Sequence, residues 1–316
     1  MTGKKLAFLF PGQGTQRVGM GEAFYKEHAE AREVFAEAEE VLGLPLRSYC
    51  FAGPAEELTA TRIAQPAIVT VTFIISQLMQ RKGIAPSFVA GHSLGEYTAL
   101  AAAGVLPFCE VLLLVRKRAE LMAAVPGEGG MAAVLNVSPE RLEEILAKYK
   151  REGLIEAANF NSPSQIVVSG EKKLVMRLAE EINSSNTSKE KTGKAILLEV
   201  SGAFHSGMMK PAAEEFGKIL AGFNFSTPVV PLVTNVTAKA VTAAGEIPGL
   251  LEKQLYSPVL WDKSLRQLEK MGAEVFLEIG GKVLTGLVKK TLPGAKTLAV
   301  VEPEDLKKVL AFLEEV

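Results

Sequence analysis

The sequence predicts an α/β fold with a mainly parallel sheet and a second, smaller unit inserted into it. Residues 5–10 (KLAFLF) form a short apolar run that ends at Pro11-Gly12, and residues 87–91 (SFVAG) form another. An apolar, alanine-rich helix follows the second run at once and ends near Gly104. A strand, a sharp turn and a buried helix in succession are typical of parallel sheets that helices cover.

Helical periodicity fills the region between these two strands, and the same alternation returns near the C-terminus. Residues 22–42 carry apolar side chains at helical spacing among many glutamates, and residues 65–82 predict a mostly buried helix. Towards the C-terminus the pattern predicts, in order, a helix over 206–222, a strand near 229–234, a helix over 261–271, a strand over 274–279 and a helix over 282–291.

A different pattern begins near residues 127–130 and predicts the inserted unit. Its expected elements are a strand over 131–137, a helix to about 151, strands near 154–160 and 165–169, a helix over 171–183, a polar loop over 183–194 and a strand over 195–200. This β-α-β-β-α-β order matches the ferredoxin-like split motif. We therefore predict a large domain from residues 1–127 and 199–316, and a small ferredoxin-like subdomain from residues 128–198.

Composition and charge exclude several classes of protein. The 316 residues include 36 acidic and 35 basic ones, so the formal net charge is −1, and apolar residues make up 48%. The apolar share excludes wholesale disorder, and the balanced charge argues against binding of nucleic acid through bulk positive charge. Cys50 and Cys109 are the only cysteines, which indicates a reducing compartment and offers neither a disulfide framework nor metal-like spacing.

We expect a cytoplasmic protein with no membrane partner. The apolar run before Pro11 is too short for a signal peptide. The most apolar stretches, residues 67–75 and 99–109, are shorter than a membrane-spanning helix requires.

A candidate nucleophile lies where the second strand meets its helix. Residues 91–95 (GHSLG) fit the pattern GxSxG, with Ser93 at the centre. The pattern alone is weak in a chain with 28 glycines, and a glycine-rich turn in which Ser93 only caps the helix is the structural alternative. The context is stronger, because a nucleophile elbow requires this strand, turn and helix, and glycines let the chain double back around an exposed serine. The helix N-terminus would also direct N–H groups at a developing anion.

Ser93 needs a base, and the chain has only three histidines. His28 stands beside glutamates on a predicted helix and reads as solvated. His92 is next to the serine, but neighbours on a tight turn usually point apart, so a structural role beside the elbow is favoured. His205 follows a predicted strand and precedes a helix, which is where a partner of the serine is expected.

At this point five segments resemble one known family. They are residues 10–16 (FPGQGTQ), 91–97 (GHSLGEY), 159–163 (NFNSP), 254–259 (QLYSPV) and 280–284 (GGKVL). Their sequences and order are similar to those of the malonyl-CoA:acyl carrier protein transacylases of bacterial fatty-acid synthesis, and the resemblance spans nearly the whole chain. It implies a large α/β-hydrolase-like domain with an inserted ferredoxin-like subdomain, in agreement with the pattern above.

The resemblance also implies roles for individual residues. Ser93 matches the nucleophile that carries the acyl group, and His205 matches its base. Gln13 and Leu94 match the residues whose backbone N–H groups form the oxyanion hole. The family needs no carboxylate beside the histidine.

Further matches concern the substrate. Arg118, 25 residues after the serine and followed by Met122, matches the arginine that binds the malonyl carboxylate. Gln254 matches the glutamine whose main chain helps to orient the histidine. Together with Arg118, the residues expected at the substrate site are therefore Met122, His92, Gln254 and Asn161.

Physical chemistry supports an arginine in this role. A planar guanidinium holds a carboxylate with two charge-assisted hydrogen bonds, and a buried one discriminates against a neutral acyl group that leaves its charge unpaired. The alternative is that residues 116–118 (RKR) form a solvated helix end, and Arg116 remains a rival for the role.

Two positions qualify the resemblance. Residues 280–282 (GGK) lack the proline of the family's usual Gly-Pro-Gly-Lys, so we assign this loop no role. Phe204 precedes the histidine, and in polyketide acyltransferase domains a phenylalanine there accompanies malonyl preference.

The resemblance implies ping-pong transfer of malonyl from malonyl-CoA, through malonyl-Ser93, to the phosphopantetheine thiol of acyl carrier protein. No bound cofactor and no metal are expected, and a monomer is the expected state. An acidic carrier protein would be guided by basic residues near the cleft. The competing hypotheses are a polyketide-type trans-acting acyltransferase, a serine hydrolase or thioesterase, and a non-catalytic carrier-binding module.

Overall fold

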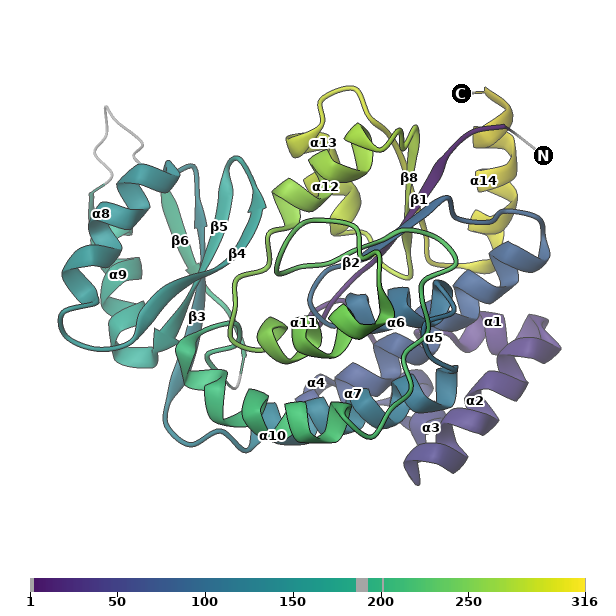
Figure 1. The fold of residues 1–316 in the computed structure, drawn as a ribbon, viewed down its shortest axis with the longest axis horizontal. Coiled ribbons are helices and arrows are strands. Elements are labelled where there is room, and N and C mark those ends of the chain that lie inside the picture. Colours follow the sequence, from purple (N-terminus) through teal and green to yellow (C-terminus); the bar gives the residue numbers. More distant parts are fainter. Residues whose placement is uncertain (1–2, 186–192, 201, 316) are drawn as a thin grey trace.

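The chain is organised by a larger parallel sheet and a smaller antiparallel one (Figure 1). The computed structural model describes residues 3–185, 193–200 and 202–315. In Figure 1 the smaller sheet and its two helices stand to one side of the larger, helix-covered sheet.

The larger sheet has the strand order β7-β2-β1-β8-β9 among the described residues, and each of its neighbouring pairs is parallel. The strands are β1 (Leu6–Phe10), β2 (Phe88–Gly91), β7 (Leu232–Val233), β8 (Val275–Ile279) and β9 (Lys296–Val300). The central strands β1, β2 and β8 are buried throughout, as expected for a parallel sheet with helices on both faces. The predicted parallel α/β sheet is therefore confirmed.

Helices on both faces bury this sheet. They are α1 (Glu22–Glu27), α2 (Ala29–Leu42), α3 (Leu46–Ala52), α4 (Ala55–Thr59), α5 (Thr61–Arg81), α6 (Gly95–Ala102), α7 (Phe108–Ala123), α10 (Lys210–Leu220), α11 (Ile247–Gln254), α12 (Trp261–Lys270), α13 (Leu284–Thr291) and α14 (Pro303–Glu315), with 3-10 turns at Gly207–Met209 and Ala244–Glu246. Phe8 and Phe10 point into the core shared with α2, α5 and α7, whereas Ala7 and Leu9 point to the core shared with α12 and α13. The alternation follows from the period of two along a strand.

The smaller sheet has the order β4-β5-β3-β6, with antiparallel pairs. Its elements are β3 (Gly129–Leu135), α8 (Pro139–Tyr149), β4 (Ile155–Ser162), β5 (Gln165–Glu171), α9 (Lys172–Ser184) and β6 (Lys194–Leu197). Ala132 and Val134 pack against α8 and α9, whereas Met131 and Ala133 turn to the opposite face and join the core of the larger unit. One face of the small sheet therefore borders the larger unit.

Backbone hydrogen bonds join the two units. The Phe160 N–H on β4 donates to the Val259 carbonyl at 2.9 Å, and the Val259 N–H donates to the Ala158 carbonyl at 2.9 Å. Val259 lies just before α12, so β4 is held against the segment that leads into this helix.

Several predicted boundaries differ from the observed ones. The helix expected over 22–42 is divided at His28, whose extended backbone (φ −124°) separates α1 from α2. The strand near 229–234 is reduced to β7. The sequence analysis missed β9 and the helices α3, α4, α11 and α14, and it gave no range for α7. The loop expected over 183–194 is helical at its start and a strand at its end, and residues 186–192 lie outside the described residues.

The buried helix expected over 65–82 begins earlier than predicted. It is α5, with 21 residues, and by length and composition alone it is the one helix among the described residues that could cross a membrane. The short apolar stretch at residues 67–75 lies inside this longer helix, because the Thr and Gln side chains around it do not end the helix. Of its most apolar window, 89% is buried inside the protein, as in the core helix of a globular domain.

The packing of β1 gives a stability prediction. Phe8 is fully buried at the centre of the larger sheet, so Phe8→Ala should lower the free energy of unfolding by about 3–5 kcal/mol. Urea denaturation at constant m-value measures the change. Val229→Ala is the control, because Val229 is 78% exposed and its truncation should change stability by less than about 0.5 kcal/mol. Equal midpoints for the two variants would contradict this packing.

Candidate active site

Ser93 stands on a strained turn between β2 and α6. Its φ is +52°, a left-handed conformation that non-glycine residues rarely adopt. A Cβ at Gly91 would lie 1.9 Å from the Gly95 carbonyl carbon, and a Cβ at Gly95 would lie 2.0 Å from the Phe10 carbonyl oxygen. Both glycines are therefore required for the chain to double back against β1. This arrangement is the elbow that the sequence predicts.

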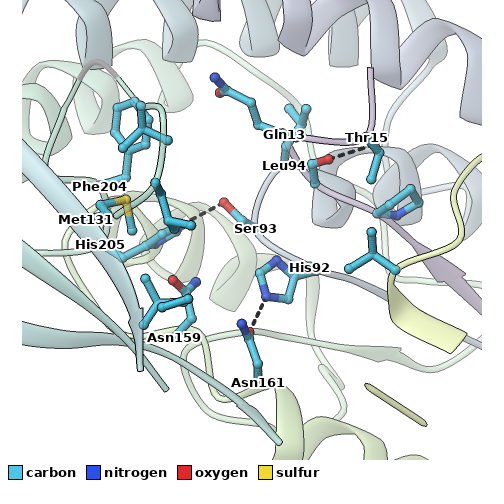
Figure 2. A pocket seen from close by; sticks show the side chains of 18 of the residues that line it. Gln13, Thr15, His92, Ser93, Leu94, Met131, Asn159, Asn161, Phe204 and His205 are labelled. Carbon is cyan, nitrogen blue, oxygen red and sulfur yellow. Dashed lines mark hydrogen bonds between the residues drawn. The ribbon is translucent and has the colours of Figure 1, made fainter. Parts of the chain in front are cut away.

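His205 is hydrogen-bonded to the serine. The Ser93 Oγ and the His205 Nε2 are 2.7 Å apart, as drawn in Figure 2, and the His205 Nδ1 is 2.7 Å from the Gln254 carbonyl oxygen. A carbonyl oxygen only accepts, so Nδ1 carries the hydrogen and Nε2 is free to accept the Ser93 hydroxyl proton. His205 also has a positive φ of +57°, and its backbone N–H donates to the Leu255 carbonyl at 3.1 Å.

The electrostatic environment keeps this imidazole neutral. Burial, and next the positive charge of Arg118, lower the pKa of His205 to about 3. At neutral pH the ring is therefore unprotonated and able to take a proton, which is the state that a general base requires.

Arg118 on α7 brings a buried positive charge to the serine. Its side chain is 1% exposed, and burial lowers its pKa. Nη1 donates to the Gln65 Oε1 at 2.9 Å, and Nη2 donates to the Ser93 Oγ and to the Gln254 Oε1, both at 3.2 Å. All three acceptors are neutral, and among the described residues no acidic side chain forms an ion pair with Arg118. The guanidinium is thus free to meet an incoming anion.

Arg116, the rival position, is engaged elsewhere. Its Nε donates to Glu120 at 2.9 Å and its Nη1 donates to the Leu42 carbonyl at 3.1 Å, on the half-exposed side of α7. It does not line the cavity described below. The structure therefore brings Arg118, rather than Arg116, to the serine.

Two backbone N–H groups beside Ser93 are available as donors. Within the described residues, the N–H groups of Gln13 and Leu94 make no hydrogen bond to protein atoms. Leu94 caps the N-terminus of α6, and Gln13 lies in the loop after β1. Both residues line the same cavity as Ser93, so their N–H groups are candidate donors to an anion that forms there.

A cavity of about 300 Å³ opens in front of Ser93, between the two sheets. Residues of both units line this cavity. The larger unit contributes Ser93, Arg118, Met122, Phe204 and His205, and the smaller unit contributes Met131, Ala133, Asn159, Asn161 and Val167. Figure 2 shows the His92 and Asn161 side chains pointing toward each other, and the His92 Nε2 is 2.7 Å from the Asn161 Oδ1.

The predicted site residues therefore meet at one place, with one difference in position. Gln13, His92, Ser93, Leu94, Arg118, Met122, Asn161 and His205 all line the cavity. Gln254 is fully buried and does not line it; it stands behind the site and contacts His205, Arg118 and Ser93. Among the described residues, no three His, Cys, Asp or Glu side chains gather as a metal site would require.

Sequence reasoning missed several buried polar side chains around the elbow. Asn235, two residues after the end of β7, accepts the Ser93 N–H at 2.7 Å and donates to the Gly91 carbonyl at 2.6 Å. Glu96 accepts hydrogen bonds from Asn235 and Gln254, and Gln65 accepts from Arg118. Only Asn235 carried a usable signal, because ligand sites in parallel α/β sheets lie at the carboxyl ends of strands.

The comparisons with known proteins agree with this geometry. The sequence profile described as acyl transferase domain matches residues 7–307. The chain belongs to the acyl transferase family. It is 47% identical, over 315 residues and 98% of each chain, to the malonyl CoA-acyl carrier protein transacylase of Bacillus subtilis strain 168.

Solved structures show the same fold for the family. The malonyl CoA-acyl carrier protein transacylase of Clostridium perfringens superposes with a TM-score of 0.92 at 37% identity, covering 98% of each chain. A second match, with a TM-score of 0.92 at 36% identity over 99% of this chain and 100% of the other, is a malonyl-transacylase in complex with its type II polyketide synthase acyl-carrier protein. As a member of this family, the chain is an acyltransferase enzyme.

The two hydrogen bonds of the Asn235 side chain, to the Ser93 N–H and to the Gly91 carbonyl, give a stability prediction for this acyltransferase. Asn235→Ala leaves the buried Gly91 carbonyl and the Ser93 N–H without partners, so it should lower the free energy of unfolding by about 1–3 kcal/mol. Asn224→Ala, at an exposed asparagine, serves as the control and should leave stability within about 0.5 kcal/mol of wild type. Thermal and urea denaturation measure the stability of both variants. An Asn235→Ala protein as stable as wild type would show that these two hydrogen bonds do not stabilise the fold.

Proposed function

We propose that this enzyme transfers the malonyl group of malonyl-CoA to the phosphopantetheine thiol of an acyl carrier protein. The observation that carries the proposal is the buried guanidinium of Arg118, which has only neutral partners and lies 3.2 Å from the Ser93 hydroxyl oxygen. An acyl group attached at this oxygen meets a cation that only an acidic acyl chain can neutralise. The family membership and the names of the relatives support the same activity.

In the first half-reaction Ser93 is the nucleophile and His205 the base. As Ser93 Oγ attacks the thioester carbonyl carbon, its proton passes to His205 Nε2, along the 2.7 Å hydrogen bond. The Gln254 carbonyl holds the Nδ1–H and stabilises the imidazolium that forms. Collapse of the tetrahedral intermediate breaks the carbon–sulfur bond, and CoA leaves as a thiol after taking the proton back from His205.

The negative charge that develops on the thioester oxygen requires donors. The unengaged N–H groups of Gln13 and Leu94 supply them, and the N-terminal end of α6 adds its positive dipole. Each such donor is typically worth about 3 kcal/mol in the transition state.

The acyl chain places its own charge near Arg118. In malonyl-Ser93 one methylene group separates the ester carbonyl from the free carboxylate, so a guanidinium at hydrogen-bond distance from Oγ is within reach. Arg118 can hold this carboxylate with two parallel hydrogen bonds. An acetyl group leaves the buried cation unpaired, which favours malonyl over acetyl.

The second half-reaction reverses the first with a new thiol. The phosphopantetheine thiol gives its proton to His205 and attacks the ester carbonyl of malonyl-Ser93. The carbon–oxygen bond breaks, and Ser93 regains a proton from His205. This gives a ping-pong sequence with one covalent intermediate.

We also propose the finer description of the fold. The small unit is ferredoxin-like and inserted over residues 128–198, and the large unit, residues 1–127 and 199–316, is α/β-hydrolase-like. Support comes from the β-α-β-β-α-β order, the strand order β4-β5-β3-β6 and the serine elbow between β2 and α6. The monomeric state, the cytoplasmic location and the absence of a bound cofactor remain predictions.

Loss of the nucleophile tests the covalent intermediate. Wild-type protein incubated with malonyl-CoA should gain the mass of one malonyl group and lose it when phosphopantetheinylated carrier protein is added. Ser93→Ala should gain no mass, because among the described residues no other hydroxyl is hydrogen-bonded to the His205 ring. A malonyl adduct that persists in Ser93→Ala would refute the mechanism.

Removal of the buried cation tests the acyl preference. Arg118→Ala should reduce malonyl transfer by about 100-fold or more, since a buried charge pair loses one partner, while acetyl transfer falls less or rises. Arg116→Ala is the matched control on the same helix and should keep the wild-type preference. Competition between radiolabelled malonyl-CoA and acetyl-CoA measures the ratio. An unchanged ratio in Arg118→Ala would reject the assignment.

A further inference from the structure

Glu96 is a buried carboxyl group that the mechanism above does not use. It stands in the first turn of α6, three residues after the nucleophile, and is 1% exposed. Its Oε2 accepts the Asn235 backbone N–H at 3.0 Å and the Gln254 Nε2 hydrogen at 2.9 Å. A carboxylate is costly to bury, so its hydrogen-bond partners indicate what it holds in place.

Both partners of Glu96 act directly on the reacting groups. The Asn235 side chain accepts the Ser93 N–H and donates to the Gly91 carbonyl, which fixes the elbow on both sides of the serine. The Gln254 Nε2 also donates to the Ser93 carbonyl at 3.0 Å, and the Gln254 backbone carbonyl orients His205. One carboxylate oxygen therefore connects the turn that carries the nucleophile with the residue that orients the base.

Glu96 also lies in the electrostatic field of Arg118. Burial raises the pKa of Glu96 to about 7, and its hydrogen bonds and the positive charge of Arg118 oppose this rise. Its charged and titratable neighbours are Arg118 on α7 and Tyr97 on α6, while α11 and the segment after β7 present the neutral groups of Gln254 and Asn235. Glu96 is thus the carboxyl group that partly balances Arg118 when the site is empty.

We propose that Glu96 is a positioning residue that aligns Ser93 with His205 through Asn235 and Gln254, and that its charge balances Arg118 until the malonyl carboxylate arrives. The inference rests on the proposed function, because the second half of it requires an acidic acyl group at Arg118.

Repulsion between the Glu96 carboxylate and the malonyl carboxylate should make the binding of malonyl-CoA depend on pH. A malonyl carboxylate at Arg118 raises the free energy of an anionic Glu96, so the substrate binds better to the protein with neutral Glu96. With a pKa of about 7, Glu96 is mostly protonated at pH 6 and mostly anionic at pH 8.5. The concentration of malonyl-CoA that half-saturates the acylation step should therefore rise, by about tenfold, as the pH increases from 6 to 8.5.

The test compares three variants in the acylation half-reaction, without carrier protein. Glu96→Gln keeps an oxygen that can accept both hydrogen bonds but removes the charge, so its acylation rate should stay within a few-fold of wild type while its half-saturation becomes independent of pH. Glu96→Ala removes the bonds, and its rate should fall about 10–100-fold, the range typical when a group that orients a reacting side chain is lost.

Asp305→Asn is the matched control. Asp305 is also a largely buried carboxylate that accepts two backbone N–H bonds, from Val301 and Glu302, and it pairs with Lys308, but it lies in the first turn of α14 and not at the cavity. Its variant should keep the wild-type pH dependence, including any contribution from ionisation of the CoA phosphates.

Each result decides a separate claim. Equal pH profiles for wild type and Glu96→Gln would overturn the charge-balancing role, and a wild-type rate in a folded Glu96→Ala protein would overturn the positioning role. If Glu96→Ala does not fold, a rate for Glu96→Gln more than tenfold below wild type would overturn the claim that an accepting oxygen suffices. A wild-type protein that gains no malonyl adduct would instead refute the proposed function itself.

Discussion

The site depends on the burial of one guanidinium without an acidic partner in contact. Arg118 is held through its Nη1 and Nη2 atoms by Gln65, Gln254 and Ser93, whereas its buried Nε has no hydrogen-bond partner among the described residues, and its charge is only partly balanced. Such a cation remains in the interior only because the surrounding core and its neutral acceptors hold it there. Burial lowers the pKa of His205 and raises that of Glu96, and the charge of Arg118 adds to the first shift and opposes the second.

Two strained residues meet at the same point. Ser93 and His205 both have positive φ values, and such conformations persist only where surrounding contacts over-determine them. For Ser93 these contacts are the Asn235 side chain and the close glycine packing against β1. For His205 they are the backbone of α11 and the residue that follows it. Rigid surroundings thus hold the reacting pair in place before substrate binds, which reduces the reorganisation needed during the reaction.

The sequence predicts local features well and distant ones poorly. The strand, turn and helix around Ser93 were predictable because glycine spacing and apolar runs report on neighbouring residues. His205 was found because only three histidines compete for the role. Glu96 and Gln65 could not be assigned, because a buried polar residue on a helix looks like any other until its distant partners are known. The break at His28 was missed since helical periodicity continues through it.

The hydrogen bonds that assemble the site join remote parts of the chain. Ser93 is 112 residues from His205, Arg118 is 136 residues from Gln254, and the Asn235 side chain binds the Ser93 N–H across 142 residues. A chain still emerging from the ribosome therefore carries the serine long before it carries the base or the carbonyl that orients it. The hydrogen bonds that assemble this site can therefore form only late in synthesis.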